Sequence, residues 1–177
     1  NIALWNSSLF SKPAHNGLTT PWHQDGEYWP IRPLKTCTVW LAIDDATIEN
    51  GCLKFIKGSH TDQKLKSHIL NENKNLTLNQ ELNKKEYDES KAVNLILKRG
   101  QISLHDVYLV HGSEANNSPK SRRAITMRFM PTTSFFDHQM VKEKKMFSKL
   151  NASKYSDRKI YHMRGIDVSG KNNLTYL

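Results

Sequence analysis

Two histidines and one aspartate in this chain have the residue types and spacing of a metal site. His23 and Asp25 lie two residues apart in segment 22–25 (WHQD), and His111 lies far along the chain in segment 110–113 (VHGS). Residues two apart in an extended strand point to the same side. His23 and Asp25 would therefore act together, and His111 from a distant strand would complete one face of an octahedron. Three positions would stay open, an arrangement typical of non-heme Fe(II) oxygenases.

An arginine pair follows these ligands and suggests a partner for an organic acid. Arg122 and Arg123 open the last strongly apolar run, eleven residues after His111. A cosubstrate that chelates iron through a 2-oxo acid leaves its far carboxylate in need of a fork-shaped cation, which arginine supplies better than lysine. The hydroxyl of Ser113 would share that carboxylate. Because side chains alternate along a strand, only one of the two arginines can face inward, and the other would lie on a solvated edge.

The other histidines offer weaker candidates. A lone His-x-Asp pattern is common on polar loops, and the chain has eight histidines. His105 and Asp106 are adjacent, so they would face opposite sides of a strand and could not chelate together. We expect them to hydrogen-bond to the metal ligands and orient them, or to form a turn at a strand end. We interpret His60 as structural and expect the remaining histidines to be solvated: His15, His68, His138 and His162.

The elements that must position these residues are short strands. Alternating apolar runs between turn signals predict strands at 2–10, 37–44, 52–56, 93–97, 100–105, 108–111 and 123–130. Segment 61–92 is polar and has no Gly or Pro, so we interpret it as a surface insertion, with a weak helix at 68–78 as the alternative. Residues 132–177 read as a C-terminal extension with a short helix near 141–150. The pattern predicts an all-β barrel or sandwich in one domain spanning 1–177.

Composition supports a single globular domain. The 177 residues are 37% hydrophobic and 24% charged, and no apolar run is long enough to cross a bilayer. The chain has no secretory leader and no initiating Met, so we expect a cytoplasmic protein whose N-terminal elements are missing. Cys37 and Cys52 would then be buried free thiols, although one disulfide is the alternative.

The net charge of +9 raises the question of nucleic-acid binding. The lysines are scattered, and no basic segment is interleaved with aromatic residues as in a strand-binding platform. We therefore expect no nucleic-acid partner and no membrane partner. The positive field favours anionic small molecules, which suits a dicarboxylate cosubstrate.

Ordered segments across about two thirds of the chain carry a more specific signal. The chain resembles the phytanoyl-CoA dioxygenase family of double-stranded β-helix oxygenases, from about Lys12 to Pro131. The shared segments are 22–25 (WHQD), 28–33 (YWPIRP), 38–42 (TVWLA), 50–53 (NGCL), 58–60 (GSH), 110–113 (VHGS) and 122–125 (RRAI).

This resemblance implies a mainly β, jelly-roll or cupin-like double-stranded β-helix with a few peripheral helices. It implies that His23, Asp25 and His111 bind Fe(II), and that Arg122, with Ser113, holds the far carboxylate of 2-oxoglutarate. Trp40 would line the cosubstrate pocket, pack in the core, or both.

The resemblance also implies an activity. With Asp25 in place of the small residue of related halogenases, hydroxylation by dioxygen is expected, with 2-oxoglutarate converted to succinate. Tyr28, Trp29 and Arg32 follow within seven residues of Asp25. They would either bind an acidic small-molecule substrate or form a packed loop. The alternatives are a non-catalytic cupin-like barrel that binds a metal or small acid, and a basic nucleic-acid-binding module.

Overall fold

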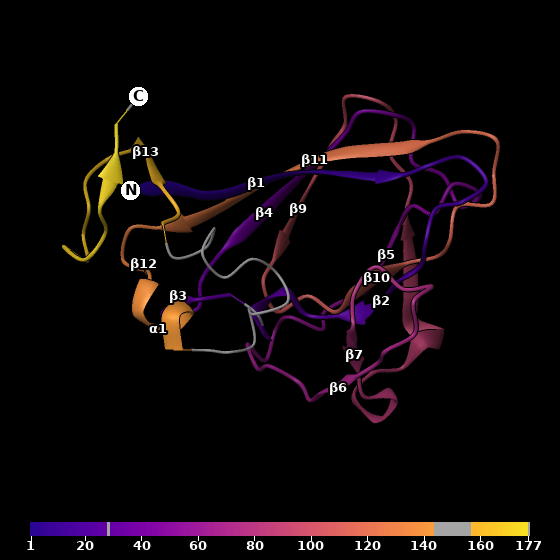
Figure 1. The fold of residues 1–177 in the computed structure, drawn as a ribbon, viewed down its shortest axis with the longest axis horizontal. Helices are drawn as coiled ribbons and strands as arrows, with labels where there is room; N and C mark the ends of the chain where they lie inside the picture. The colour runs from indigo at the N-terminus through magenta and orange to yellow at the C-terminus, as the bar shows by residue number, and fades with distance from the viewer. Residues whose placement is uncertain (28, 144–156, 177) are drawn as a thin grey trace.

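A six-stranded sheet forms one wall of the fold (Figure 1). The computed structural model describes residues 1–27, 29–143 and 157–176. The order across the sheet is β14-β13-β1-β11-β4-β9, and all neighbouring strands are antiparallel except β13 and β14, which are parallel. The strands are β1 (Ile2–Lys12), β4 (Cys37–Ala42), β9 (Ile102–Asp106), β11 (Arg122–Pro131), β13 (Ile160–Arg164) and β14 (Leu174–Thr175).

A four-stranded sheet, in the order β2-β10-β5-β8, forms the second wall. Its strands are β2 (Thr20–His23), β5 (Leu53–Ile56), β8 (Ala92–Leu95) and β10 (His111–Ser113). Two small strand pairs complete the β-structure: β3 (Ile31–Arg32) with β12 (Phe135–Phe136), and β6 (His68–Leu70) with β7 (Gln80–Leu82). Among the residues that the structure describes, the helical elements are α1 (His138–Glu143) and three 3-10 turns at Asp25–Glu27, Lys84–Glu86 and Glu89–Lys91. The predicted fold class, mainly β with few helices, is confirmed.

The sheets are held together by side chains that alternate along the strands. In β4, Thr38, Trp40 and Ala42 are buried while the residues between them are not. Trp40 and Ala42 pack in one cluster with Leu53 and Leu95 of the opposite sheet. The inner faces of the two sheets therefore share a core, and any side chain on these inner positions points into the space between them.

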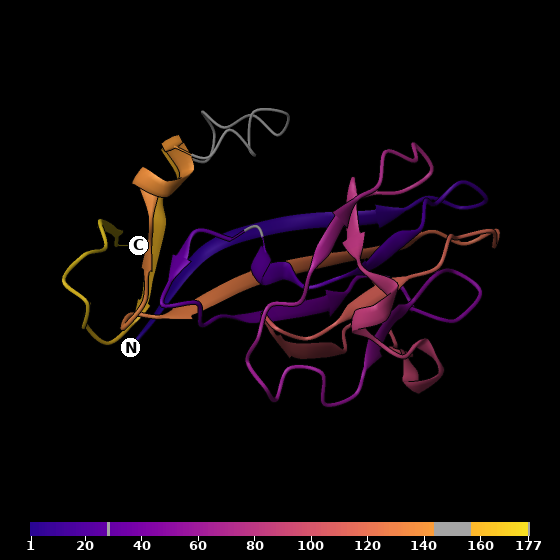
Figure 2. The ribbon, with the colours of Figure 1, turned by 90° about the horizontal axis from the view of Figure 1, so that it is seen from below.

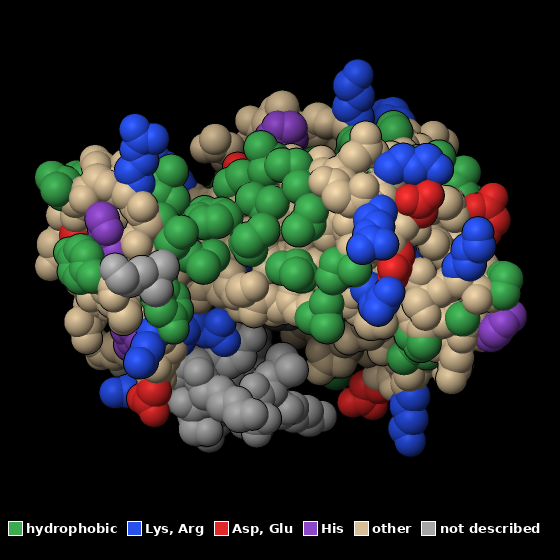
Figure 3. Space-filling view, turned by 90° about the horizontal axis from the view of Figure 1, so that it is seen from above, with side chains coloured by type: hydrophobic (Ala, Val, Ile, Leu, Met, Phe, Trp, Pro, Cys, Tyr) green, Lys and Arg blue, Asp and Glu red, His purple; other side chains and the backbone are tan. Residues whose placement is uncertain are grey.

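The outer face of the large sheet is also apolar. Strand register places Leu9 beside Ile125, Ile125 beside Leu41, and Leu41 beside Ile102, so one apolar row crosses four strands. Leu9 and Ile102 are 66% and 53% exposed. Figure 3 shows hydrophobic side chains gathered on the face seen from above.

Both termini lie at the same end of the molecule, beside β12, β13 and α1 (Figure 2). Strand β13 pairs with β1, so part of the C-terminal extension completes the large sheet. Ile160 is buried there in a second core cluster with Trp5 and Phe136. Helix α1 begins earlier than the helix expected near 141–150, and the remainder of that range lies outside the described residues.

The polar segment 61–92 carries the β6–β7 hairpin, so the helix alternative for 68–78 is wrong. The segment also contributes to the core, because Leu82 is buried against Ile56 and Val110. Cys37 and Cys52 are free, and Cys37 is exposed rather than buried as expected. Within the described ranges, no helix is long and apolar enough to span a membrane.

Candidate metal centre and its surroundings

Three side chains that are far apart in the sequence converge where the two sheets face each other. One ligand atom from each of His23, Asp25 and His111 lies within 4.8 Å of the others. Strand β2 ends at His23, the following turn carries Asp25, and β10 begins at His111 directly opposite His23. His23 Nε2 lies 3.7 Å from Asp25 Oδ1, and the two imidazole centroids are 4.2 Å apart. The residues selected from the sequence are therefore brought together as one group.

Backbone carbonyls orient both imidazoles. His23 Nδ1 lies 2.8 Å from the Pro21 carbonyl oxygen, and His111 Nδ1 lies 2.9 Å from that of Leu109. A carbonyl only accepts, so each Nδ1 carries the hydrogen and each Nε2 keeps a lone pair. Fixing the tautomer in this way is characteristic of metal-bound histidines. Burial lowers the pKa of His23 to about 3, so its imidazole is neutral and ready to act as a ligand at neutral pH.

Asp25 is held as a carboxylate. Burial alone would raise its pKa, but the nearby His111 and Arg128 side chains outweigh burial and bring that pKa below its ordinary value. Two imidazoles and one carboxylate form a donor set that suits Fe(II) and other first-row divalent metals.

The amide of Gln24 ties the ligand strand to two other segments. Gln24 is fully buried between His23 and Asp25. Its Nε2 donates to the carbonyls of Lys64 and Tyr108 at 3.1 and 2.6 Å, and its Oε1 accepts from the Lys66 backbone N–H at 2.8 Å. Gln24 therefore links the ligand turn to the polar segment and to the loop that precedes His111.

A buried histidine adds to this link. The Gln24 backbone N–H donates to His68 Nε2 at 3.1 Å, and His68 Nδ1 lies 2.9 Å from the Lys66 carbonyl oxygen. The His68 side chain is only 2% exposed, so the expectation that it is solvated is wrong. The polar composition of its segment concealed this contact.

Replacing Gln24 by Leu is expected to lower the free energy of unfolding by about 2–4 kcal/mol, because two carbonyls and one N–H would lose buried partners. Denaturant unfolding of the metal-free protein measures this change. Gln101→Leu is a matched control because Gln101 is exposed, and its effect should stay near 0.5 kcal/mol. Equal losses in the two variants would contradict the role of Gln24.

The arginine pair divides as strand alternation requires. Arg122 is buried, its Nε and Nη2 donate to the Gly51 carbonyl at 3.1 and 3.0 Å, and its guanidinium carbon lies 5.5 Å from the Trp40 ring centroid. Arg123 points outward and binds Asp44 through two bonds of 2.8 Å. Arg122, rather than Arg123, therefore faces the space between the sheets.

A second cation and an unpaired hydroxyl accompany Arg122. Lys12 lies directly opposite Arg122 in the strand register and is buried. Burial and the charge of Arg122 lower its pKa to about 7, although Glu114 acts in the opposite direction. The buried hydroxyl oxygen of Ser113 has no hydrogen-bond partner among the described residues. Two buried cations and a free hydroxyl make this end of the space suited to a carboxylate.

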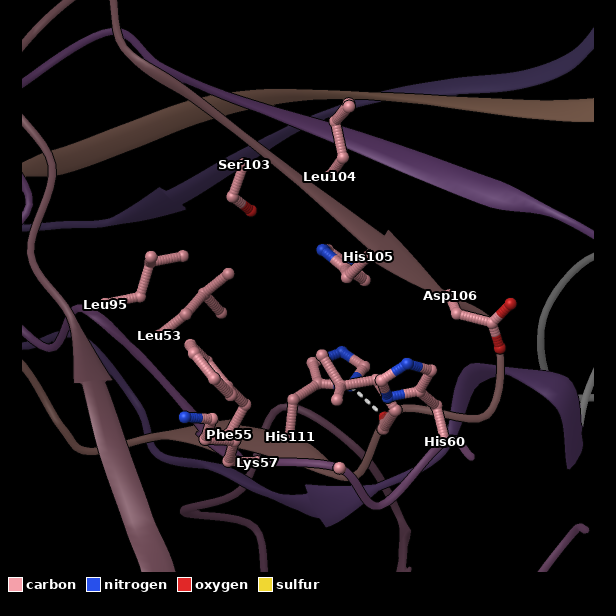
Figure 4. Close-up of a pocket in the computed structure, with 12 residues that line it drawn as sticks. Leu53, Phe55, Lys57, His60, Leu95, Ser103, Leu104, His105, Asp106 and His111 are labelled. Carbon is pink, nitrogen blue, oxygen red and sulfur yellow. Dashed lines mark hydrogen bonds between the residues drawn. The ribbon is translucent and has the colours of Figure 1, made fainter. Parts of the chain in front are cut away.

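A cavity of about 270 Å³ opens beside the metal group (Figure 4). Its walls come from both sheets, and they include Leu53, Phe55, Leu95, Leu104, His105 and His111. The His105 ring lies 5.2 Å from that of His111, and burial lowers its pKa to about 3. Asp106 also borders the cavity, and its carboxylate accepts the Tyr108 backbone N–H at 2.8 Å. His105 therefore lies beside the metal ligands, whereas Asp106 stabilises the turn that follows the strand.

The three residues suggested for the substrate have different surroundings. Arg32 donates to the carbonyls of Ile31 and Trp29 at 2.6 and 3.3 Å. Trp29 is 8% exposed and packs edge-on against Trp5 in the core. Tyr28 lies outside the described residues.

Sequence reasoning overlooked Gln24, Lys12 and Arg128. Arg128 could have been found from the sequence, because it lies an even number of residues from Arg122 in the same strand. Side chains at such positions point to the same face, which is the buried one. Gln24 and Lys12 carried no comparable signal, since their side chains bond to backbone atoms, as Lys12 Nζ does to the Leu18 and Glu114 carbonyls.

Known protein families and curated proteins include relatives of this chain. The family model of phytanoyl-CoA dioxygenase (PhyH) matches residues 2–124. A phytanoyl-CoA dioxygenase domain-containing protein 1 homolog from Dictyostelium discoideum is 40% identical over 110 residues, which cover 61% of this chain and 39% of that protein. The peroxisomal phytanoyl-CoA dioxygenase of Homo sapiens is 33% identical over 135 residues, covering 73% and 39%. The chain thus spans about two fifths of these relatives.

Several solved structures are also similar to this chain. The non-heme monooxygenase ThoJ has a TM-score of 0.65 and 27% identity, over 75% of this chain and 48% of that one. EvdO2 from Micromonospora carbonacea var. aurantiaca, solved in complex with 2-oxoglutarate, has a TM-score of 0.58 and 28% identity over 70% and 51%. With a family model that covers more than half of the residues, this chain belongs to the phytanoyl-CoA dioxygenase family.

Proposed function

We propose that this chain is an Fe(II)- and 2-oxoglutarate-dependent dioxygenase that hydroxylates a small organic metabolite. The observation that carries the proposal is the group formed by His23, Asp25 and His111, with both Nε2 lone pairs and the carboxylate within 4.8 Å of one another. These three side chains would hold the metal and leave its other positions to small molecules. The 2-oxoglutarate complex of EvdO2 supports the choice of cosubstrate.

The opposite end of the space would hold the far carboxylate of 2-oxoglutarate. Arg122 supplies the charge, and the Ser113 hydroxyl, which lacks a partner among the described residues, supplies a further donor. Trp40 packs beside the guanidinium and restricts its orientation. Buried cations are costly unless paired, so a carboxylate here would relieve an existing electrostatic cost.

Asp25 determines which reaction fits. With the carboxylate present, all three protein ligands are available, and no extra position is opened for a halide. The bound metal and cosubstrate would supply the oxidising chemistry: dioxygen and 2-oxoglutarate convert a substrate C–H to C–OH and yield succinate and carbon dioxide. The apolar cavity walls, such as Leu53 and Leu95, would exclude water from the reacting carbon.

Lys12 gives 2-oxoglutarate binding a pH dependence. Below pH 7, a protonated Lys12 adds a second positive charge beside Arg122, and above pH 7 that charge is lost. A bound carboxylate favours the protonated form, so affinity should fall as the pH rises from 7 to 9. The fall should be on the order of tenfold for each unit by which binding raises the Lys12 pKa. Calorimetric titrations at pH 6.5, 7.5 and 8.5 measure this, and Lys12→Met should flatten the profile. A wild-type profile that is already flat would contradict it.

Succinate release tests the function. Protein supplied with Fe(II), ascorbate, 2-oxoglutarate and air should release succinate slowly alone and faster with a substrate from a library of small organic acids. The His23→Ala variant is the matched control and should release none. A protein that binds metal and 2-oxoglutarate but forms no succinate under any condition would instead be a non-catalytic binding barrel.

A further inference from the structure

A second buried arginine faces the metal group. Arg128 lies on the inner face of β11, six residues and roughly 20 Å along the strand from Arg122. The register places Arg128 beside Thr38, and Thr38 beside His105, in one row across three strands. His105 in turn lies 5.2 Å from His111. Arg128 is therefore level with the metal ligands, whereas Arg122 lies at the far end of the cosubstrate space.

The Arg128 guanidinium has almost no polar partners. Arg128 is 9% exposed, its buried Nε has no partner among the described residues, and its one hydrogen bond is a long 3.5 Å contact from Nη1 to Ser8 Oγ. Its guanidinium carbon lies 5.1 Å from the Trp29 ring and 5.7 Å from the Phe10 ring. Aromatic contacts orient the planar group but do not neutralise it.

The Arg128 charge is permanent and lies level with the metal group. Arg128, Thr38 and His105 form one row across three strands, and the His105 ring lies 5.2 Å from that of His111. Yet Arg128 and Asp25 form no ion pair within the parts of the chain that the structure describes. Arg128 thus lies level with the ligand group but leaves its own donors free.

A second unpaired donor lies in the same row. The buried Thr38 hydroxyl also has no hydrogen-bond partner among the described residues. Thr38 and the Arg128 Nε–H belong to directly paired positions on adjacent strands. One small anion would satisfy both groups, and a carboxylate matches the planar guanidinium fork.

We propose that Arg128, assisted by Thr38, binds the carboxylate of the primary substrate, which is therefore a small organic monocarboxylate. This inference rests on the proposed function and names its substrate class. A single negative charge is favoured because Arg128 is the one permanent cation among the residues of this row, which are Arg128, Thr38 and His105. Trp29 and Phe10 would cover the guanidinium. With the carboxylate held there, the adjoining carbons would lie beside the metal group.

The test uses the Arg128 Nε–H signal in ¹⁵N-labelled protein, which requires neither metal nor turnover. Butyrate is titrated in the presence of saturating 2-oxoglutarate, so that Arg122 is occupied, and butyramide serves as the neutral probe. The Arg128 signal should shift saturably with butyrate and remain in place with butyramide. An unshifted signal, or equal shifts with both probes, would overturn the proposal.

Variants separate charge from structure. Arg128→Gln should weaken butyrate binding at least tenfold, Arg128→Lys should weaken it less, and Thr38→Val should weaken it a few-fold. Arg123→Gln, at an exposed position already paired with Asp44, should leave it unchanged. If Arg128→Gln does not fold, the shift of the wild-type Nε–H signal and the butyrate affinity of Arg128→Lys still test the proposal. Failure of 2-oxoglutarate binding would appear at the saturation step, before butyrate is added, and is therefore distinguished from failure of this inference.

Discussion

Replacing His111 by Ala is expected to abolish stoichiometric Fe(II) binding. His111 and His23 supply the two nitrogen ligands of the group, and their Nδ1 hydrogen bonds to carbonyls direct both Nε2 atoms to one point. Only one imidazole and one carboxylate would remain, too few to hold the metal firmly. Anaerobic equilibrium dialysis followed by iron quantification measures the bound fraction, which should fall from about one equivalent to background.

A suitable control is His15→Asn. His15 is exposed and has a φ of 62°, a left-handed conformation that Asn tolerates better than Ala. The control should keep full iron binding, and circular dichroism should show both variants folded. A folded His111→Ala protein that still binds one equivalent of Fe(II) would contradict the assignment of this ligand.

Replacing Arg122 by Ala is expected to weaken 2-oxoglutarate binding by about 1.5–3 kcal/mol, or roughly 10- to 150-fold, because charge-assisted hydrogen bonds to a buried carboxylate are lost. Iron binding should persist, since Arg122 is not part of the metal group. Anaerobic calorimetry of Fe(II)-loaded protein with 2-oxoglutarate measures both the affinity and the stoichiometry.

Arg123→Ala serves as the matched control, because Arg123 is exposed and bound to Asp44. The loss of 2-oxoglutarate affinity should occur in Arg122→Ala and not in Arg123→Ala. Arg122 also donates to the Gly51 carbonyl, so Arg122→Lys is needed to separate charge from loop support. Unchanged affinity in Arg122→Ala, or an equal loss in Arg123→Ala, would place the carboxylate elsewhere.

Much of the fold was predictable because strand alternation is a local property. In β4 and β11 the inward and outward positions follow directly from a period of two, which also turns Arg122 inward and Arg123 outward. The spacing of His23 and Asp25 predicted that the two ligands lie together, although only His23 belongs to strand β2 and Asp25 lies in the 3-10 turn that follows. What joins them to His111 is the pairing of β2 with β10, which the sequence implied only through the family resemblance.

Contacts made to backbone atoms were not predictable. His68 lies in a polar segment, and nothing local reveals that its ring accepts the Gln24 backbone N–H. The three bonds of the Gln24 amide depend on where distant loops pass, which only the folded chain determines. The pairing of β13 with β1 is another non-local contact that residue types did not indicate.

Metal and 2-oxoglutarate are expected to bind together at this site. An anaerobic titration of Fe(II)-loaded protein with 2-oxoglutarate, followed by visible absorption, tests it most directly. A weak metal-to-ligand charge-transfer band that saturates at one equivalent is the predicted result, and it should be absent in His111→Ala. Folded, iron-loaded wild-type protein that develops no such band would contradict the account.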